Sequence, residues 1–87
     1  MMTPLDFVLR KFITEGALAV TLPDGATTFY RGAKPGPQAG MRIATSAAVR
    51  GLILNPGLAF GEAYMDGTIT PEGCSLYDLL HVLMLNA

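Results

Sequence analysis

The chain has 87 residues and a formal net charge of −1, which limits it to one small domain or a piece of a larger protein. Only 15% of its residues are charged and 51% are hydrophobic, so we expect an apolar face left exposed for lipid, a partner subunit or another domain. A nucleic-acid partner is not expected, because no cluster of Lys and Arg would neutralise phosphates.

The charges are unevenly divided along the chain. Residues 1–50 carry six bases and three acids, whereas residues 51–87 carry four acids and no base. This division either orients a weakly basic face towards anionic lipid or lets the two halves attract each other, and the second interpretation is the simpler one. The bases are Arg10, Lys11, Arg31, Lys34, Arg42 and Arg50.

The sequence predicts a cytoplasmic protein. Cys74 is the only cysteine, so no disulfide can form within the chain, and a reducing compartment is the simpler interpretation. The first residues lack the basic and apolar regions of a signal peptide. No apolar run reaches the roughly 18 residues that a membrane-spanning helix needs.

A helix is predicted over residues 3–15. Thr3 and Asp6 have the spacing of a capping box, and Pro4 suits the first helical position. The apolar residues then recur at helical spacing, and Gly16 is expected to end the helix. That apolar stripe consists of Leu5, Val8, Leu9, Phe12 and Ile13.

Most of a small sheet is predicted within residues 17–45. Residues 17–31 have the alternation of a β-hairpin around the turn Pro23-Asp24-Gly25. The segment from Gly32 to Gly40 is rich in Gly and Pro and is expected to be an exposed loop. A third strand is predicted from Met41 to Thr45.

Three helices and a short strand are predicted in the remainder. Ser46 is expected to cap a helix from Ala47 to Leu54, and Asn55 to cap a second helix from Gly57 to about Met65 that stops at Gly67. Residues 68–70 are expected to form a short strand. Ser75, with Asp78 three residues later, is expected to cap the last helix.

The last helix, Leu76 to Leu85, is apolar on every side apart from Asp78 and His81. Such a helix is either buried or packed against something else. Its candidate lipid-contacting or interface residues are Leu79, Leu80, Leu83 and Met84.

No catalytic or metal site is predicted. His81 and Cys74 are the only soft ligands and have no second pair, so a metal site is not expected. Glu62 and Asp66 lie four residues apart and would share one face of a helix, where a desolvated carboxylate can act as an acid or base. The simpler interpretation is that Asp66 closes the helix and Glu62 is solvated. Tyr64 and Met65 are interpreted as packing residues.

The segment Gly57-Leu58-Ala59-Phe60-Gly61-Glu62-Ala63-Tyr64-Met65-Asp66-Gly67 closely resembles a signature in the N-terminal domain of bacterial cyclopropane-fatty-acyl-phospholipid synthases. Weaker similarity runs from Gly16-Ala17-Leu18 through Met41-Arg42-Ile43 to the last helix. The signature residues are Gly61, Glu62, Tyr64, Met65, Asp66 and Gly67, and the resemblance implies a structural role for them.

The resemblance implies a methyltransferase that adds a methylene from S-adenosylmethionine across an acyl-chain double bond of a phospholipid. It further implies that residues 1–87 form a single non-catalytic accessory domain related in shape to sterol-carrier lipid-binding folds. The cofactor and the catalytic residues would belong to a Rossmann-like domain absent from this chain. Expected partners are phospholipid acyl chains or the inner membrane surface, that catalytic domain, and a second copy in a homodimer.

The overall expectation is an α+β fold, with a small antiparallel sheet of a hairpin and one or two further strands packed with three or four helices. Two other functions remain open. One is a free-standing oligomer that buries the helix 76–85 against itself. The other is an enzyme complete in itself that uses Glu62 and Asp66.

Overall fold

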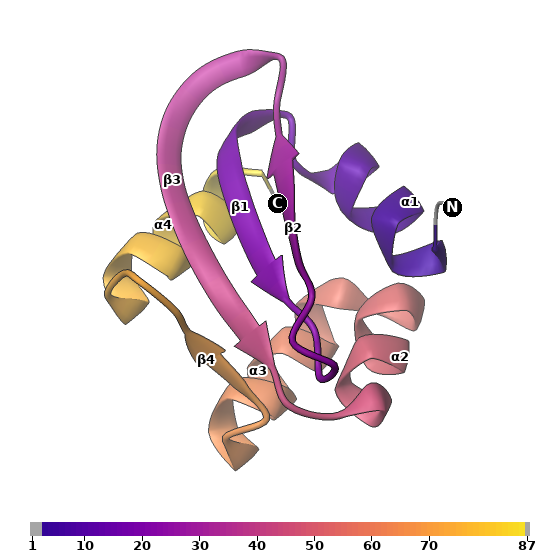
Figure 1. Ribbon diagram of the computed structural model, residues 1–87. Helices are drawn as coiled ribbons and strands as arrows, with labels where there is room; N and C mark the ends of the chain where they lie inside the picture. Colours follow the sequence, from indigo (N-terminus) through magenta and orange to yellow (C-terminus); the bar gives the residue numbers. More distant parts are fainter. Residues whose placement is uncertain (1–2, 87) are drawn as a thin grey trace.

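The computed structural model describes residues 3–86, which form a four-stranded sheet and four helices (Figure 1). The predicted α+β class is confirmed. The helices are α1 (Pro4–Phe12), α2 (Ser46–Leu54), α3 (Pro56–Asp66) and α4 (Leu76–Leu85). The strands are β1 (Glu15–Thr21), β2 (Thr27–Arg31), β3 (Lys34–Ile43) and β4 (Ile69–Pro71).

The sheet is mixed rather than purely antiparallel. Its order is β2-β1-β3-β4, and the pairs β1–β2 and β3–β4 are antiparallel as expected, but β1 and β3 are parallel. After β2 the chain crosses the start of β1, where the amide of Gly32 donates to the carbonyl of Gly16 at 2.9 Å. A side chain at Gly32 would collide with the backbone of Thr14, since an added Cβ would lie 2.2 Å from its carbonyl carbon. The missing side chain thus lets β3 pair on the far side of β1.

Most of the segment from Gly32 to Gly40 is exposed as predicted, but the prediction of a loop is wrong, because β3 begins at Lys34. The pairing with β1 shifts from Glu15–Lys34 to Ala17–Gln38, so β3 bulges outward opposite Gly16. Both prolines of β3 fall in this irregular segment, where a strand tolerates residues without an amide hydrogen.

Two predicted helix boundaries also need correction. The first helix ends at Phe12 rather than at residue 15, because Glu15 and Gly16 belong to β1. Thr45, not Ser46, caps α2 by accepting a hydrogen bond from the amide of Ala48 at 3.1 Å. The other predicted helix starts are confirmed, including the capping boxes of α1 and α4.

All four helices lie on one face of the sheet, and the other face is uncovered (Figure 1). Alternation along β1 sends Leu18 and Val20 into the core, while Ala17 and Ala19 lie on the uncovered face. The buried core residues are Leu5, Leu9, Ile13, Leu18, Val20, Tyr30, Met41, Ile43, Leu52, Ala63, Ile69, Leu79 and Val82.

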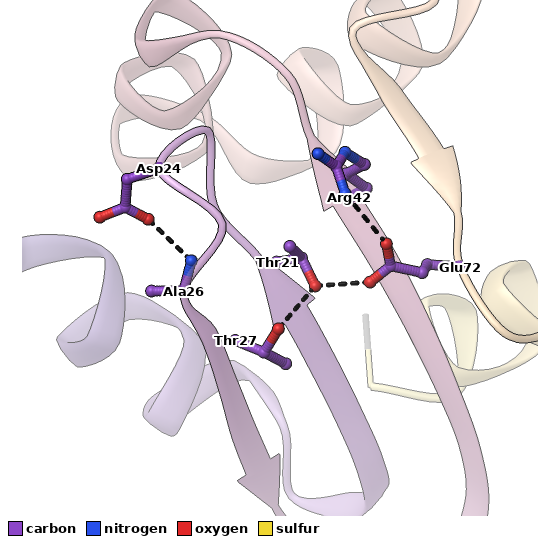
Figure 2. A network of polar contacts seen from close by, with 6 residues as sticks. All are labelled: Thr21, Asp24, Ala26, Thr27, Arg42 and Glu72. Carbon is purple, nitrogen blue, oxygen red and sulfur yellow. Dashed lines mark hydrogen bonds and ion pairs between the residues drawn. The ribbon is translucent and has the colours of Figure 1, made fainter.

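A polar network lies across β1 and β3 (Figure 2). The hydroxyl of Thr21 donates to Glu72 and shares a 2.9 Å hydrogen bond with Thr27, while Arg42 pairs with Glu72 at 3.5 Å. Thr21 is only 5% exposed, so these partners satisfy a hydroxyl that would otherwise be costly to bury.

Asn86 joins the end of α4 to the start of β1. Its side-chain oxygen accepts hydrogen bonds from the amides of Thr14 and Glu15 at 2.8 and 2.9 Å. Its side-chain nitrogen donates to the carbonyls of Glu15 and Val82 at 3.0 and 2.8 Å. This amide therefore fixes the position of α4 against the sheet.

Candidate functional site

An apolar pocket of about 220 Å³ lies among the helices. Its lining comes from α1, α3 and α4, together with Leu52 of α2 and Met41 of β3. The helical residues that line it are Leu9, Phe12, Leu52, Gly57, Phe60, Leu80, Leu83 and Met84.

The four residues of α4 that were predicted to contact lipid or a partner do not all face the same way: Leu79 faces the core, and Leu80, Leu83 and Met84 face the pocket. Leu79 and Val82 are fully buried against the sheet, so Leu79 is a core residue and not a contact for lipid or a partner. Leu80, Leu83 and Met84 line the pocket, because successive helical residues turn by about 100°. Met84 is 74% exposed and forms part of the rim.

The chemistry of this pocket is restricted to binding. Every side chain that lines it is apolar, and only Gly57 contributes no side chain. Without a donor, acceptor or titratable side chain, the pocket can exclude water from an apolar group but cannot transfer a proton.

The signature residues lie outside this pocket, in the last two turns of α3 and at its end. Glu62 and Asp66 do share one face, where they line a separate depression between α2 and α3 whose other residues are mostly Ala, Gly and Thr. Asp66 accepts hydrogen bonds from the amide and the hydroxyl of Thr68 at 3.1 and 2.7 Å. Gly67 caps the helix with a left-handed φ of 83°. Asp66 and Gly67 thus close α3, as predicted.

The interpretation of Met65 as a packing residue is wrong. Its side chain is 87% exposed, because it points away from the sheet near the end of a helix that contacts the core through Ala63. Tyr64 is 42% exposed and stacks on Phe60, with ring centres 6.4 Å apart. Gly61 has open space at its missing side chain, so packing does not require glycine there.

Cys74 and His81 are not brought together into a site. The Cys74 sulfur lies 3.4 Å from the carbonyl oxygen of Gly40, and the ring of His81 lies 6.1 Å from that of Tyr77. Within residues 3–86, no group of three or more His, Cys, Asp or Glu side chains is placed to hold a metal ion.

The sequence alone did not identify the pocket. The sequence shows the apolar stripe that includes Leu9 and Phe12. It does not show that these residues pack near Leu80 and Leu83, which lie about 70 positions further along the chain. Only the path of the sheet brings α1 and α4 together. None of the helices in residues 3–86 combines the length and apolar character required to cross a membrane.

No curated protein matches the chain. A sequence model of one family matches residues 7–87, which is nearly the whole chain and includes the pocket and the signature segment. The chain therefore belongs to the family described as domain of unknown function DUF7884.

Proposed function

We propose that this domain is the non-catalytic, lipid-engaging part of a cyclopropane-fatty-acyl-phospholipid synthase-like methyltransferase. The observation that carries the proposal is the wholly apolar pocket bordered by Leu80, Leu83 and Met84. The resemblance of residues 57–67 to the synthase signature supports the choice of enzyme. S-adenosylmethionine and the catalytic residues would belong to another domain.

The pocket suits part of an acyl chain better than a polar substrate. Its volume of about 220 Å³ is below the roughly 300–1,000 Å³ of typical small-molecule sites, but an extended alkyl chain is narrow. Because no polar side chain lines it, a carboxylate or phosphate would have to remain outside, beyond the rim at Met84.

The proposal can be tested with a fluorescently labelled long-chain fatty acid at concentrations below vesicle formation. Leu80→Trp should fill the pocket and weaken binding roughly tenfold, as expected if about two methylenes are displaced. Met84→Gln should weaken binding more modestly. Tyr77→Gln is the matched control, because Tyr77 is also on α4 and is 75% exposed, close to the 74% of Met84, but lies outside the pocket.

Failure of the unmodified domain to bind the probe, or equal losses in Met84→Gln and Tyr77→Gln, would contradict the pocket assignment. The same variants address the alternative of self-association through α4, which leaves Tyr77, Met84 and Leu85 exposed. A dimer in sedimentation that both glutamine variants dissociate would favour that alternative. A stable monomer at micromolar concentration would oppose it.

A further inference from the structure

The charge division of the sequence is largely uncompensated in the fold. Among residues 3–86, the ion pair within 4.0 Å is Arg42–Glu72, at 3.5 Å. Within this part of the chain, the two halves therefore attract each other through one exposed pair, and the other five bases have no carboxylate at that range.

Four of the five bases gather at one end of the molecule, which we call the basic end: Arg10, Lys11, Arg31 and Lys34. Arg31 ends β2 and Lys34 begins β3, and the amide of Lys34 donates to the carbonyl of Thr14 at 3.2 Å. Arg10 and Lys11 occupy the last turn of α1, which leads directly into Thr14. Figure 1 shows these segments meeting where β2 ends and β3 begins.

The acids of α3 and of the hairpin turn lie towards the opposite end. Asp24 is in the turn between β1 and β2, and Glu62 and Asp66 are on α3 (Figure 1). At the basic end, Glu15 begins β1 and Asp6 lies one turn before Arg10 on α1, so four bases stand against two acids. The domain is therefore electrically polarised even though its net charge is only −1.

The outer face of α1 adds an aromatic ring to the basic end. Phe7 is 53% exposed, and the ammonium nitrogen of Lys11 lies 4.5 Å from the centre of its ring. An exposed aromatic residue among bases is typical of helical surfaces that rest in the headgroup region of a bilayer.

We propose that the basic end is the surface by which this domain docks onto an anionic lipid bilayer, with α3 pointing away from the membrane. The inference rests on the proposed lipid-engaging function and adds to it the lipid charge and the orientation. Bases close to an anionic leaflet are attracted within a Debye length, whereas the acids of α3 would be repelled if they faced it. Charge complementarity therefore favours the orientation in which the basic end faces the bilayer.

Vesicle co-sedimentation of the domain tests the orientation. We expect binding to phosphatidylglycerol-rich vesicles at low salt and little binding to phosphatidylcholine vesicles. The double variant Arg31→Gln/Lys34→Gln should weaken binding about 25-fold, taking roughly fivefold for each base lost near an anionic surface. The matched control, Arg42→Gln/Arg50→Gln, changes the net charge equally but outside the basic end, and should weaken binding less than about threefold.

Equal losses in the two double variants would overturn the proposal, since net charge and not orientation would then govern binding. Equal affinity for both kinds of vesicle would also overturn it, as would tighter binding to a DNA duplex than to the anionic vesicles. The outcome is separable from that of the pocket, because the fatty-acid probe contains no bilayer. If the unmodified domain bound the fatty-acid probe but not the vesicles, only the docking role of the basic end would be rejected. If the unmodified domain did not bind the probe, the proposed function would be rejected.

Discussion

Gly16 permits the irregular pairing of β1 with β3. Its φ of 76° is in the left-handed region, which side chains disfavour. A Cβ added there would lie 2.2 Å from the carbonyl oxygen of Pro37, which is backbone and cannot rotate away. Gly25 has a similar φ of 90° in the hairpin turn, but an added Cβ would meet nothing within 4 Å.

Alanine substitutions at these two glycines distinguish the free-energy cost of an unfavourable φ from that of a steric clash. Gly25→Ala should lower the free energy of unfolding by about 1–2 kcal/mol, because only the backbone conformation is penalised. Gly16→Ala should lower it by about 3 kcal/mol or more, because β3 must also move. Urea unfolding monitored by circular dichroism measures both values, and equal costs would show that β3 does not press on Gly16.

At the residue scale, local interactions were predictable from the sequence and distant ones were not. The capping partners of α1 and α4 lie three residues apart, so their spacing was sufficient to find them. Asn86 carried no such signal, because its partners Thr14 and Glu15 are more than 70 residues away. The exposure of Met65 was also hidden, since helical spacing does not show which face of α3 meets the sheet.

Among the elements, α1 is held to the sheet by a contact that depends on ionisation. The hydroxyl of Tyr30 in β2 donates a hydrogen bond to the carboxylate of Asp6. This bond, followed by the backbone hydrogen bond from Thr3, lowers the pKa of Asp6 below its usual 3.8. Burial and the neighbouring carboxylate raise the pKa of Tyr30, so the tyrosine stays protonated and continues to donate.

This contact predicts a loss of stability in acid. Because the folded-state pKa of Asp6 is lowered, its contribution is fully present above the unfolded value and is lost as pH falls through the folded value. Tyr30→Phe should lower the free energy of unfolding by about 1 kcal/mol at neutral pH, and by less in acid. Urea midpoints measured from neutral pH down to about pH 3 should fall less steeply in Asp6→Asn than in the unmodified domain. Parallel curves for the two proteins would contradict the assignment.

The element that the sequence misrepresented is β3. Gly and Pro are reliable signs of a loop when the backbone must turn, but here they allow a long strand to bulge over Gly16 and then pair regularly from Gln38 to Ile43. The Gly and Pro content therefore correctly indicated an irregular backbone, but it wrongly indicated a loop instead of a strand.

At the scale of the whole molecule, the α+β class followed from the order of helical and alternating patterns. The parallel pairing of β1 with β3 did not, because it depends on the crossing at Gly32, which has no periodic signal. The gathering of all four helices on one face likewise follows from that topology. The pocket and the basic end are both products of this arrangement, since each combines α1 with segments distant in sequence.

The same arrangement predicts that folding and membrane docking respond differently to salt. The two halves are joined by a buried apolar core and by Arg42–Glu72, whose side chains are 56% and 44% exposed. An exposed ion pair contributes at most about 1 kcal/mol, so Arg42→Gln and a change from low to high sodium chloride should each shift the free energy of unfolding by less than about 1 kcal/mol. Binding to anionic vesicles should instead fall steeply over the same salt range. Urea unfolding at the two salt concentrations gives the first measurement and co-sedimentation the second. If stability fell as steeply as vesicle binding, the basic residues would be holding the fold together and could not be free to face a membrane.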